Sequence, residues 1–314
     1  MNKVSTVPVS NLLPCRSSSP FVLDQLQVMR RQEKEPVYSS KNYLQGDLLL
    51  SLKANFQPEE VHPIDQTCRM KMIEWAFDVI DFVDYQRETV FIATNFLDRY
   101  LSSSDPLAQR ALMNRQEYQL SSISALYLAI KLNEQTDIDS SVFATLSRGV
   151  YSVEAILKNE QQILKVLNWR LCCPSSLSFQ HHFLKILPSS IRHYPWLMKQ
   201  IEELSNFQLD LSIGDYYFST RKPSIIAVAS LLNAMQHYGE HFNRKESSLF
   251  KKNIVSAVQI NCHSKEMREV RSRLAELLLA NGVTLREDMN QFSSNYRATS
   301  PTCISSFFRM ASRS

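Results

Sequence analysis

Apolar residues recur at helical spacing along most of this chain. Residues 67–83 are apolar on most sides and predict a helix, with Thr67 positioned as its N-cap. The same periodicity predicts four more helices before residue 170, over 88–101, 119–132, 140–148 and 152–167. Small residues in the third of these helices, such as Ser121 and Ala125, allow neighbouring helices to approach closely.

A break with Pro174 at its centre follows, and the helical rhythm then resumes. Pro223 suits the first turn of a helix, where a missing N–H costs nothing. The expected helices of this second half cover 176–187, 195–213, 222–238, 246–258 and 264–280. The two halves therefore repeat in helix count, and the sequence predicts an all-α fold of two tandem five-helix domains.

The domain boundaries follow from these breaks. Residues 1–37 are expected to form a flexible N-terminal segment with short helices around Pro36. The first domain, with a helix preceding it as an N-terminal extension, is predicted over 38–170, and the second over 171–282. Residues 283–314 are rich in Ser, Thr and Arg and are expected to form a flexible tail.

Composition narrows the class of protein. The chain has only 5 glycines, against roughly twenty expected from average usage of about 7%, which argues against glycine-rich nucleotide-binding loops. A formal net charge of +4 without a polybasic arm makes nucleic acid an unlikely partner. The 6 cysteines include no CxxC pair, and neither a secretory segment nor an apolar run of 18 residues is present. These observations favour a reduced, intracellular, soluble protein without a membrane partner. They do not choose between nucleus and cytoplasm, and we expect the protein in both.

Few motifs suggest catalysis. The string HYGEH, from His237 to His241, fits H-x-x-E-H, a pattern that can hold zinc on a helix. Gly239 lies inside it and the helix is already ending, so the interpretation we prefer is a polar helix end with solvated histidines. His181 and His182 are neighbours and diverge on a helix. We therefore expect no bound metal, no cofactor and no catalytic residue.

Two charged positions stand out among large apolar side chains. Asp98 and Arg99 end an apolar helix, and the spacing of polar residues around Asp98 slightly favours exposure to solvent over burial in an ion pair. Glu160 interrupts an otherwise apolar stripe of the helix over 152–167. Its carboxylate is either solvated at the rim or available for a partner.

Several strings together resemble the cyclin box. They are CRMKMIEW at 68–75, ETVFIATNFLDRYLS at 88–102, YQLSSISALYLAIKLNE at 118–134 and NEQQILKVLNW at 159–169. The resemblance is specific over 38–170 and rests on the helix pattern beyond. It implies two tandem cyclin-box domains in a protein without catalytic activity of its own. Such a protein activates a cyclin-dependent Ser/Thr protein kinase by repositioning the kinase's mobile helix and activation loop, and so controls cell-cycle progression.

The resemblance also assigns roles to residues. Lys131 and Glu160 match the pair that reaches the kinase, and Arg69 and Asp98 match an internal ion pair between the first two helices. The apolar part of the kinase contact falls on Leu128, Leu132, Leu164, Trp169 and Leu171, and Tyr43 matches an aromatic residue of the preceding helix.

A second site is implied for kinase substrates or inhibitors. The matching positions of this docking groove are Cys68, Met72, Trp75 and Gln119, but Lys71 stands where an aliphatic residue is usual, so the groove is modified. The alternative function is a nucleic-acid-binding transcription factor, because general transcription factors use the same double five-helix fold. That class has no reason to keep Lys131 and Glu160 at this spacing.

Overall fold

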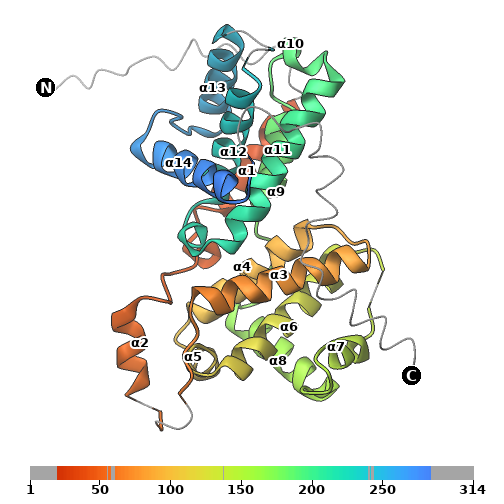
Figure 1. Cartoon of the computed structure of the whole chain (residues 1–314), viewed down its shortest axis with the longest axis vertical. Coiled ribbons are helices and arrows are strands. Elements are labelled where there is room, and N and C mark those ends of the chain that lie inside the picture. Colours follow the sequence, from red (N-terminus) through yellow and green to blue (C-terminus); the bar gives the residue numbers. More distant parts are fainter. Residues whose placement is uncertain are drawn as a thin grey trace, which may run out of the picture.

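The computed structural model of this chain describes residues 20–54, 56–57, 61–136, 138–239, 241 and 244–283 (Figure 1). Within these ranges every regular element is a helix, apart from an isolated bridge between His62 and Asn114. Two helical domains follow one another along the long axis of the molecule. The all-α, two-domain prediction is confirmed.

The first domain is built around α6 (Arg115–Asn133), which is buried along most of its length. The four other helices that the sequence predicted here are α3 (Gln66–Phe82), α4 (Glu88–Leu101), α7 (Ser140–Leu146) and α8 (Val153–Val166). Ser121, Ser124 and Ala125 of α6 are all buried, and α4 and α8 both pack against this helix. The small side chains therefore lie where the sequence placed them, at close helix contacts.

The second domain repeats this plan around α12 (Pro223–His237), whose residues Ser224–Met235 are all buried. Pro223 occupies its first turn, as expected. Around it lie α9 (Ser176–Leu184), α11 (Pro195–Gly214), α13 (Arg244–Val258) and α14 (Lys265–Ala280), together with the short helices α10 (Ser189–Arg192) and η3 (Tyr216–Phe218).

The start of α3 differs from the prediction. Its N-cap is Asp65, whose side chain accepts a hydrogen bond from the amide N–H of Cys68 at 2.7 Å, and the helix begins at Gln66. The prediction of Thr67 as the N-cap was wrong. A carboxylate at this position accepts from the free N–H groups of the first turn and faces the positive end of the helix dipole.

Of two short helices in the first domain, one was not predicted and the other was expected only as a preceding helix without stated bounds. One is α5 (Pro106–Met113), in the connection between α4 and α6, with Asp105 as its N-cap and Pro106 at its first position. Its buried residues are Ala108, Ala111, Leu112 and Met113. The other is α2 (Gly46–Lys53), which packs against α5. Eight residues are too few for helical periodicity to stand out in a sequence.

The N-terminal segment binds the domain that is farther along the chain. Residues 20–32, predicted as part of a flexible segment, form α1 (Pro20–Gln32), which packs against α9 and α13 (Figure 1). Glu33 is buried just after it and accepts hydrogen bonds from the backbone N–H (3.0 Å) and hydroxyl (2.5 Å) of Ser224. The short helix η1 (Pro36–Tyr38) follows. Residues 1–19 and 284–314 lie outside the described ranges.

Candidate partner-binding surface

A buried ion pair joins α3 to α4. The guanidinium of Arg69 donates to both carboxylate oxygens of Asp98, from Nε at 3.1 Å and from Nη2 at 2.7 Å. Its Nη1 donates to the carbonyl of Ile213 in the second domain at 2.6 Å. Asp98 is only 5% exposed, so the preference for a solvent-exposed carboxylate was wrong. The structure pairs Arg69 with Asp98, as the resemblance implies.

Tyr43 belongs to the same buried cluster. Its hydroxyl donates to Asp98 at 2.6 Å, and its ring packs edge-on against Tyr216 with 5.3 Å between centroids. Burial, followed by the negative charge of Asp98, raises the pKa of Tyr43 well above its ordinary value. Tyr43 is 1% exposed. The expectation that it contributes to a partner contact is therefore not met, because its side chain lies inside the protein.

Burial by itself lowers the pKa of Arg69, but the charge of Asp98 opposes this effect and the net shift is upward. The Arg69 guanidinium therefore stays charged in a site closed to water. A buried, fully bonded pair of this kind ties helices together and has no free group left for acid–base chemistry.

Arg99, the neighbour of Asp98, also has a structural role. Its Nε donates to the carbonyl of Val37 at 3.0 Å and its Nη2 to the carbonyl of Arg170 at 2.8 Å. The guanidinium also lies over the ring of Tyr38, 5.2 Å from its centroid. It thus joins α4 to the N-terminal segment and to the linker between the domains. Asp98 and Arg99 therefore both have structural roles, and their side chains join α4 to different parts of the protein.

Lys131 and Glu160 meet on the surface of the first domain. Lys131 Nζ, at the end of α6, lies 2.7 Å from Glu160 Oε1 on α8, and 5.0 Å from the centroid of the Tyr127 ring. The Glu160 side chain is 6% exposed and that of Lys131 40% exposed. Of the two alternatives for Glu160, the structure selects a carboxylate that has a partner. Tyr127, which supports the ammonium group, was not identified from the sequence.

The apolar residues expected around this pair are not all at the surface. Leu132 and Trp169 are exposed, by 52% and 69%, and Leu171 is half-buried. Leu128 and Leu164 are buried in the core beneath them and offer little surface to a partner.

Trp169 also has an unusual backbone. It and Asn168 both have positive φ, 59° and 50°, at the end of α8. Asn tolerates this conformation, whereas Trp in it is uncommon. The large, exposed ring of Trp169 is therefore held by a strained turn, a feature that concentrates at binding and active sites.

The expected docking groove lies on the outer side of α3. Cys68, Met72 and Trp75 are half-buried, and Lys71 is exposed among them. Gln119, near the start of α6, is exposed and its Oε1 accepts a hydrogen bond from Tyr151 at 3.1 Å. These residues lie on α3 and α6, two helices that pack against each other, and their role as a docking groove stays a prediction.

The HYGEH string does not form a helical pair of histidines. Helix α12 ends at His237, and the ring of His241 packs edge-on against Trp196 at 4.9 Å between centroids. Burial lowers the pKa of His237. Glu240 lies outside the described residues. Over the described ranges, no three His, Cys, Asp or Glu side chains are placed to hold a metal ion, and no helix is long and apolar enough to cross a membrane.

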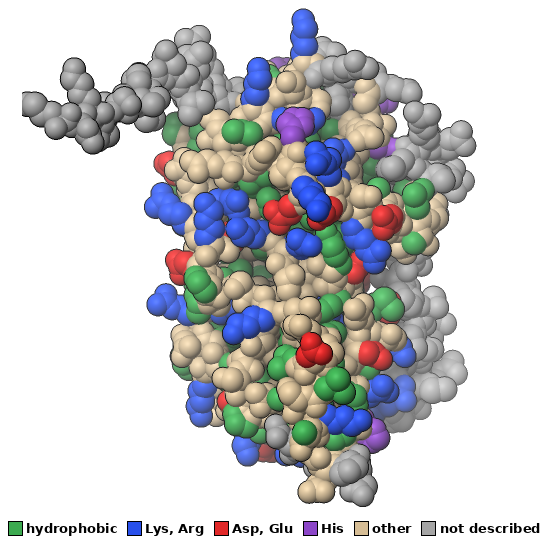
Figure 2. Space-filling view, turned by 90° about the vertical axis from the view of Figure 1, so that its left-hand side faces the viewer, with side chains coloured by type: hydrophobic (Ala, Val, Ile, Leu, Met, Phe, Trp, Pro, Cys, Tyr) green, Lys and Arg blue, Asp and Glu red, His purple; other side chains and the backbone are tan. Residues whose placement is uncertain are grey.

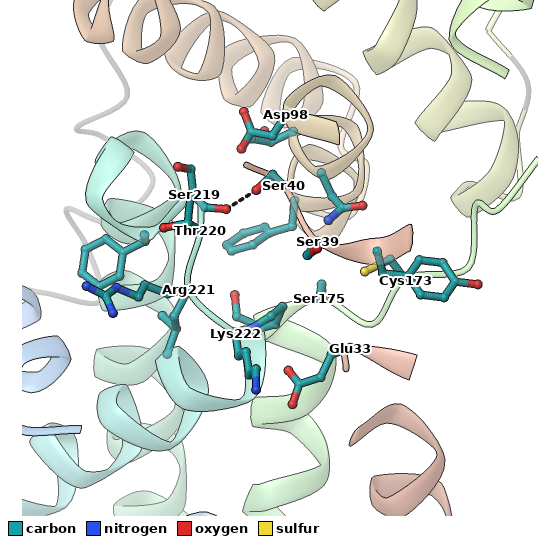
Figure 3. Close-up of a pocket in the computed structure, with 18 of the residues that line it drawn as sticks. Glu33, Ser39, Ser40, Asp98, Cys173, Ser175, Ser219, Thr220, Arg221 and Lys222 are labelled. Atoms are coloured by element: carbon teal, nitrogen blue, oxygen red, sulfur yellow. Dashed lines mark hydrogen bonds between the residues drawn. The ribbon is translucent and has the colours of Figure 1, made fainter. Parts of the chain in front are cut away.

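A cavity of about 370 Å³ lies where the N-terminal segment passes between the domains (Figure 3). Asp98 borders it on one side and Glu33 on the other, and the Ser40 hydroxyl donates across it to the carbonyl of Ser219. Both carboxylates are already fully bonded, by Arg69 and Tyr43 in one case and by Arg30 and Ser224 in the other. The cavity is therefore a gap between interlocked parts of the scaffold.

Comparison with known proteins identifies two family matches that together cover most of the chain. Residues 27–172 match the family described as "Cyclin, N-terminal domain", and residues 174–307 match "Cyclin, C-terminal domain". The boundary between the two matches falls at the break around Pro174 from which the sequence analysis separated the domains.

Individual relatives agree with these matches. The chain is 26% identical to Cyclin-A2-2 of Arabidopsis thaliana over 267 residues, which cover 81% of this chain and 56% of that protein. It is 30% identical to Cyclin-A2 of Xenopus laevis over 167 residues, covering 53% and 37%. A viral cyclin from herpesvirus saimiri has a similar fold, with a TM-score of 0.54 at 14% identity over 73% of this chain and 97% of the viral one. The chain thus spans about half or less of these curated relatives' length.

Proposed function

This chain belongs to the cyclin family, and from that premise we propose that it is a non-catalytic subunit that binds and activates a cyclin-dependent Ser/Thr protein kinase. The surface that we assign to the kinase centres on the Lys131–Glu160 pair, with Leu132, Trp169 and Leu171 beside it. The complex of this chain with the kinase would control cell-cycle progression, and it would act in the nucleus and cytoplasm.

The observation that carries the proposal is the form of the Lys131–Glu160 pair. Glu160 is buried and fixes the position of the Lys131 ammonium group, which remains 40% exposed. Lys131 has three N–H donors, of which one is used for Glu160, so others are free to meet acceptors on a partner. A charge held in one place loses little side-chain entropy when a partner binds.

Exposed apolar side chains lie beside the Lys131 ammonium group, as at the centre of a protein–protein interface. Stable interfaces have an apolar centre in which a few aromatic or charged side chains provide most of the binding energy. Trp169 and Leu132 are more than half exposed, although both are large and apolar. A partner that covered them would remove them from water and surround the ammonium group of Lys131.

The energy that this function requires is attainable. Shifting a kinase from about 1% to about 99% active takes roughly 5.5 kcal/mol of preferential binding to the active state. An interface of about 1,600 Å² with a few strong contacts provides that much. The kinase's Lys–Glu pair and activation loop are the parts that such binding would put in place.

Kinase substrates or inhibitors would use the modified groove of Cys68, Met72, Trp75 and Gln119. Lys71 places a positive charge in this apolar surface and would disfavour ligands that bring a cation there.

The nucleic-acid-binding alternative has less support. The formal net charge is only +4. On the face shown in Figure 2, Lys and Arg side chains, some of them side by side, share the surface with acidic and hydrophobic ones. Phosphate backbones are bound by clustered cations.

The test is a pull-down from cell extract with the wild-type chain and the Lys131→Ala/Glu160→Ala variant, followed by phosphorylation of histone. Removing both partners together avoids leaving a buried carboxylate without its cation. Wild type should recover a cyclin-dependent kinase and its activity, and the variant neither. The matched control is Lys265→Ala/Glu269→Ala, which removes an exposed pair on α14 and should behave as wild type. If the wild-type chain brings down no kinase, the proposed function is wrong.

A further inference from the structure

A second opening between the domains lies on the side of α3 that faces the second domain, with a volume of about 500 Å³. Helices α3, α11 and α14 line it, and we call it the α3–α14 groove. Met72 and Trp75 of the expected docking groove are not part of its lining. Its apolar surface comes from Met70, Ile73 and Phe77 on α3, Phe207 and Leu211 on α11, and Leu277 on α14.

Part of this apolar surface is open to water. Met70 is 43% exposed, although it lies in the middle of the groove-facing side of α3. Leu211 and Leu277 are half-buried. Ile73 and Phe77 are buried, and the Arg87 guanidinium lies 4.3 Å from the centroid of the Phe77 ring. Two domains that met here for structural reasons alone would bury these side chains against each other, because apolar area left in water forgoes the stabilisation that burial provides.

The rim of the groove carries an excess of negative charge. Four carboxylates line it, from Glu74, Asp78, Asp210 and Asp215, against the two guanidinium groups of Arg87 and Arg273. Arg87 binds Asp210 at 3.0 Å, and Arg273 binds Asp215 at 2.7 Å.

The other two acids, Glu74 and Asp78, are one turn apart on α3. Neither forms a hydrogen bond or ion pair within the described part of the chain. Burial, then the charges of Asp81 and Glu74, raise the pKa of Asp78 to about 6. A cation placed between Glu74 and Asp78 would relieve this repulsion.

The chain itself supplies a segment of matching chemistry. Asn281 lines the groove, and the described part of the chain ends two residues later, at Val283. The residues that follow contain no acid after Asp288, and residues 307–310 read Phe-Phe-Arg-Met. This stretch has two aromatic rings and a thioether, which match the apolar surface of the groove, and one guanidinium group, which matches its acidic rim.

The connection is long enough. Residues 284–306 separate α14 from this stretch, and an extended chain covers about 3.3 Å per residue. The entropy cost of closing a loop grows only slowly with its length. The composition of a segment therefore matters more for docking than its distance from Val283. Phe292 and Tyr296 are nearer but are weaker candidates, because they are single aromatic residues, whereas Phe307 and Phe308 are adjacent and are followed by Arg309.

We propose that residues 307–310 dock in the α3–α14 groove of the same chain. Phe307 and Phe308 would cover the apolar surface around Met70 and Leu277, and the Arg309 guanidinium would lie between the carboxylates of Glu74 and Asp78. The docked segment would join the two domains on the side opposite to the expected docking groove. This inference does not depend on the proposed kinase partner.

The methionines allow a direct test by methyl NMR on the full-length chain labelled at Met. Met70 lies in the groove, Met72 is on the same helix outside it, and Met310 is in the docking segment. In Phe307→Ala/Phe308→Ala, we expect the Met70 methyl signal to move, because the ring currents are lost, and that of Met310 to take the position of an unstructured peptide. The Met72 signal should stay in place.

Two further variants complete the test. Glu74→Lys/Asp78→Lys should release Met310 in the same way, and Phe292→Ala/Tyr296→Ala should leave both signals as in wild type. The proposal is overturned if Met310 is already at the unstructured position in the wild-type chain, or if Phe307→Ala/Phe308→Ala leaves Met70 unchanged. It is also overturned if the Met70 shift depends on protein concentration, which would mean docking between two chains.

Discussion

Arg69 of α3 and Asp98 of α4 face each other through two hydrogen bonds, at 3.1 and 2.7 Å, in a site closed to water. Because Arg69 also donates to Ile213, this single pair links two helices of the first domain to the second domain. Asp98→Ala leaves the guanidinium buried without its partner. We expect the free energy of unfolding to fall by about 3–5 kcal/mol, measured by urea denaturation.

The control is an ion pair on the surface. Lys265 and Glu269 lie one turn apart on α14 at 3.7 Å, with side chains 84% and 47% exposed. Glu269→Ala should cost about 0.3–0.5 kcal/mol, because exposed pairs of this kind contribute little. If both variants lose the same small amount of stability, the Arg69–Asp98 pair does not hold the domains as described.

Tyr43→Phe separates a structural role from a binding role. The change removes the hydroxyl that donates to Asp98 at 2.6 Å and keeps the ring against Tyr216. A hydrogen bond to a charged group contributes about 1.5–3 kcal/mol, and we expect a loss of that size in urea denaturation. Because Tyr43 is buried, the affinity of the folded chain for a kinase should be unchanged, as measured by titration calorimetry. If Tyr43→Phe lowers the affinity for the kinase without lowering the stability of the chain, Tyr43 takes part in the kinase contact after all.

The sequence predicted the helices better than it predicted which residues reach the surface. Apolar periodicity placed α4 and α8 within a residue at each end, because both have long, regular apolar faces. It missed α5 and gave no bounds for α2, because eight residues hold too few turns for a period to appear. Helix α1 was missed for another reason. Val22, Leu26 and Met29 do follow a helical spacing in it, but its contacts with α9 and α13, which hold it in place, cannot be read from the sequence.

The candidate partner-binding surface could also be predicted only in part. The resemblance identified Lys131 and Glu160, but it did not indicate that they bond to each other or that Tyr127 lies beneath the ammonium group. Nor did it separate Trp169, which is exposed, from Leu164, which is buried one turn earlier. Both are apolar, and only the structure shows that Leu164 packs into the core from α8 whereas Trp169 lies in the turn after this helix. Arg99 joins α4 to the N-terminal segment and to the linker through the backbone carbonyls of Val37 and Arg170, and no side chain in the sequence marks such partners.

Trp169 provides the sharpest test of the assigned kinase surface. Aromatic side chains at the centre of an interface often contribute about 2 kcal/mol or more, so Trp169→Ala should weaken kinase binding by roughly 30-fold. The free chain should lose little stability, because the ring is 69% exposed. Kinase affinity by titration calorimetry and unfolding in urea together measure the two effects.

The chain offers a matched control in Trp196, which is 51% exposed in the second domain. Trp196→Ala should leave kinase affinity unchanged. If the two tryptophan variants lose affinity equally, or if neither does, the contact lies elsewhere on the molecule.

The N-cap of α3 makes a pH-dependent prediction. The amide N–H of Cys68 donates to Asp65 at 2.7 Å and lowers the pKa of Asp65 from its ordinary value of 3.8. The folded state therefore binds this proton less tightly than the unfolded state does. The stabilisation by Asp65 is complete above the unfolded pKa and is lost as the pH falls through the folded pKa.

At pH 7 we expect Asp65→Ala to cost about 1 kcal/mol, as is usual for the loss of a carboxylate N-cap. The difference between variant and wild type should shrink as the pH falls from about 4 through the folded pKa, because protonated Asp65 is a poorer acceptor. Thr67→Ala is the control. Thr67 lies inside the first turn of α3 and is exposed, so its loss should be small at every pH. Urea midpoints of the three proteins between pH 3 and 7 measure this, and a larger loss for Thr67→Ala would restore Thr67 as the cap.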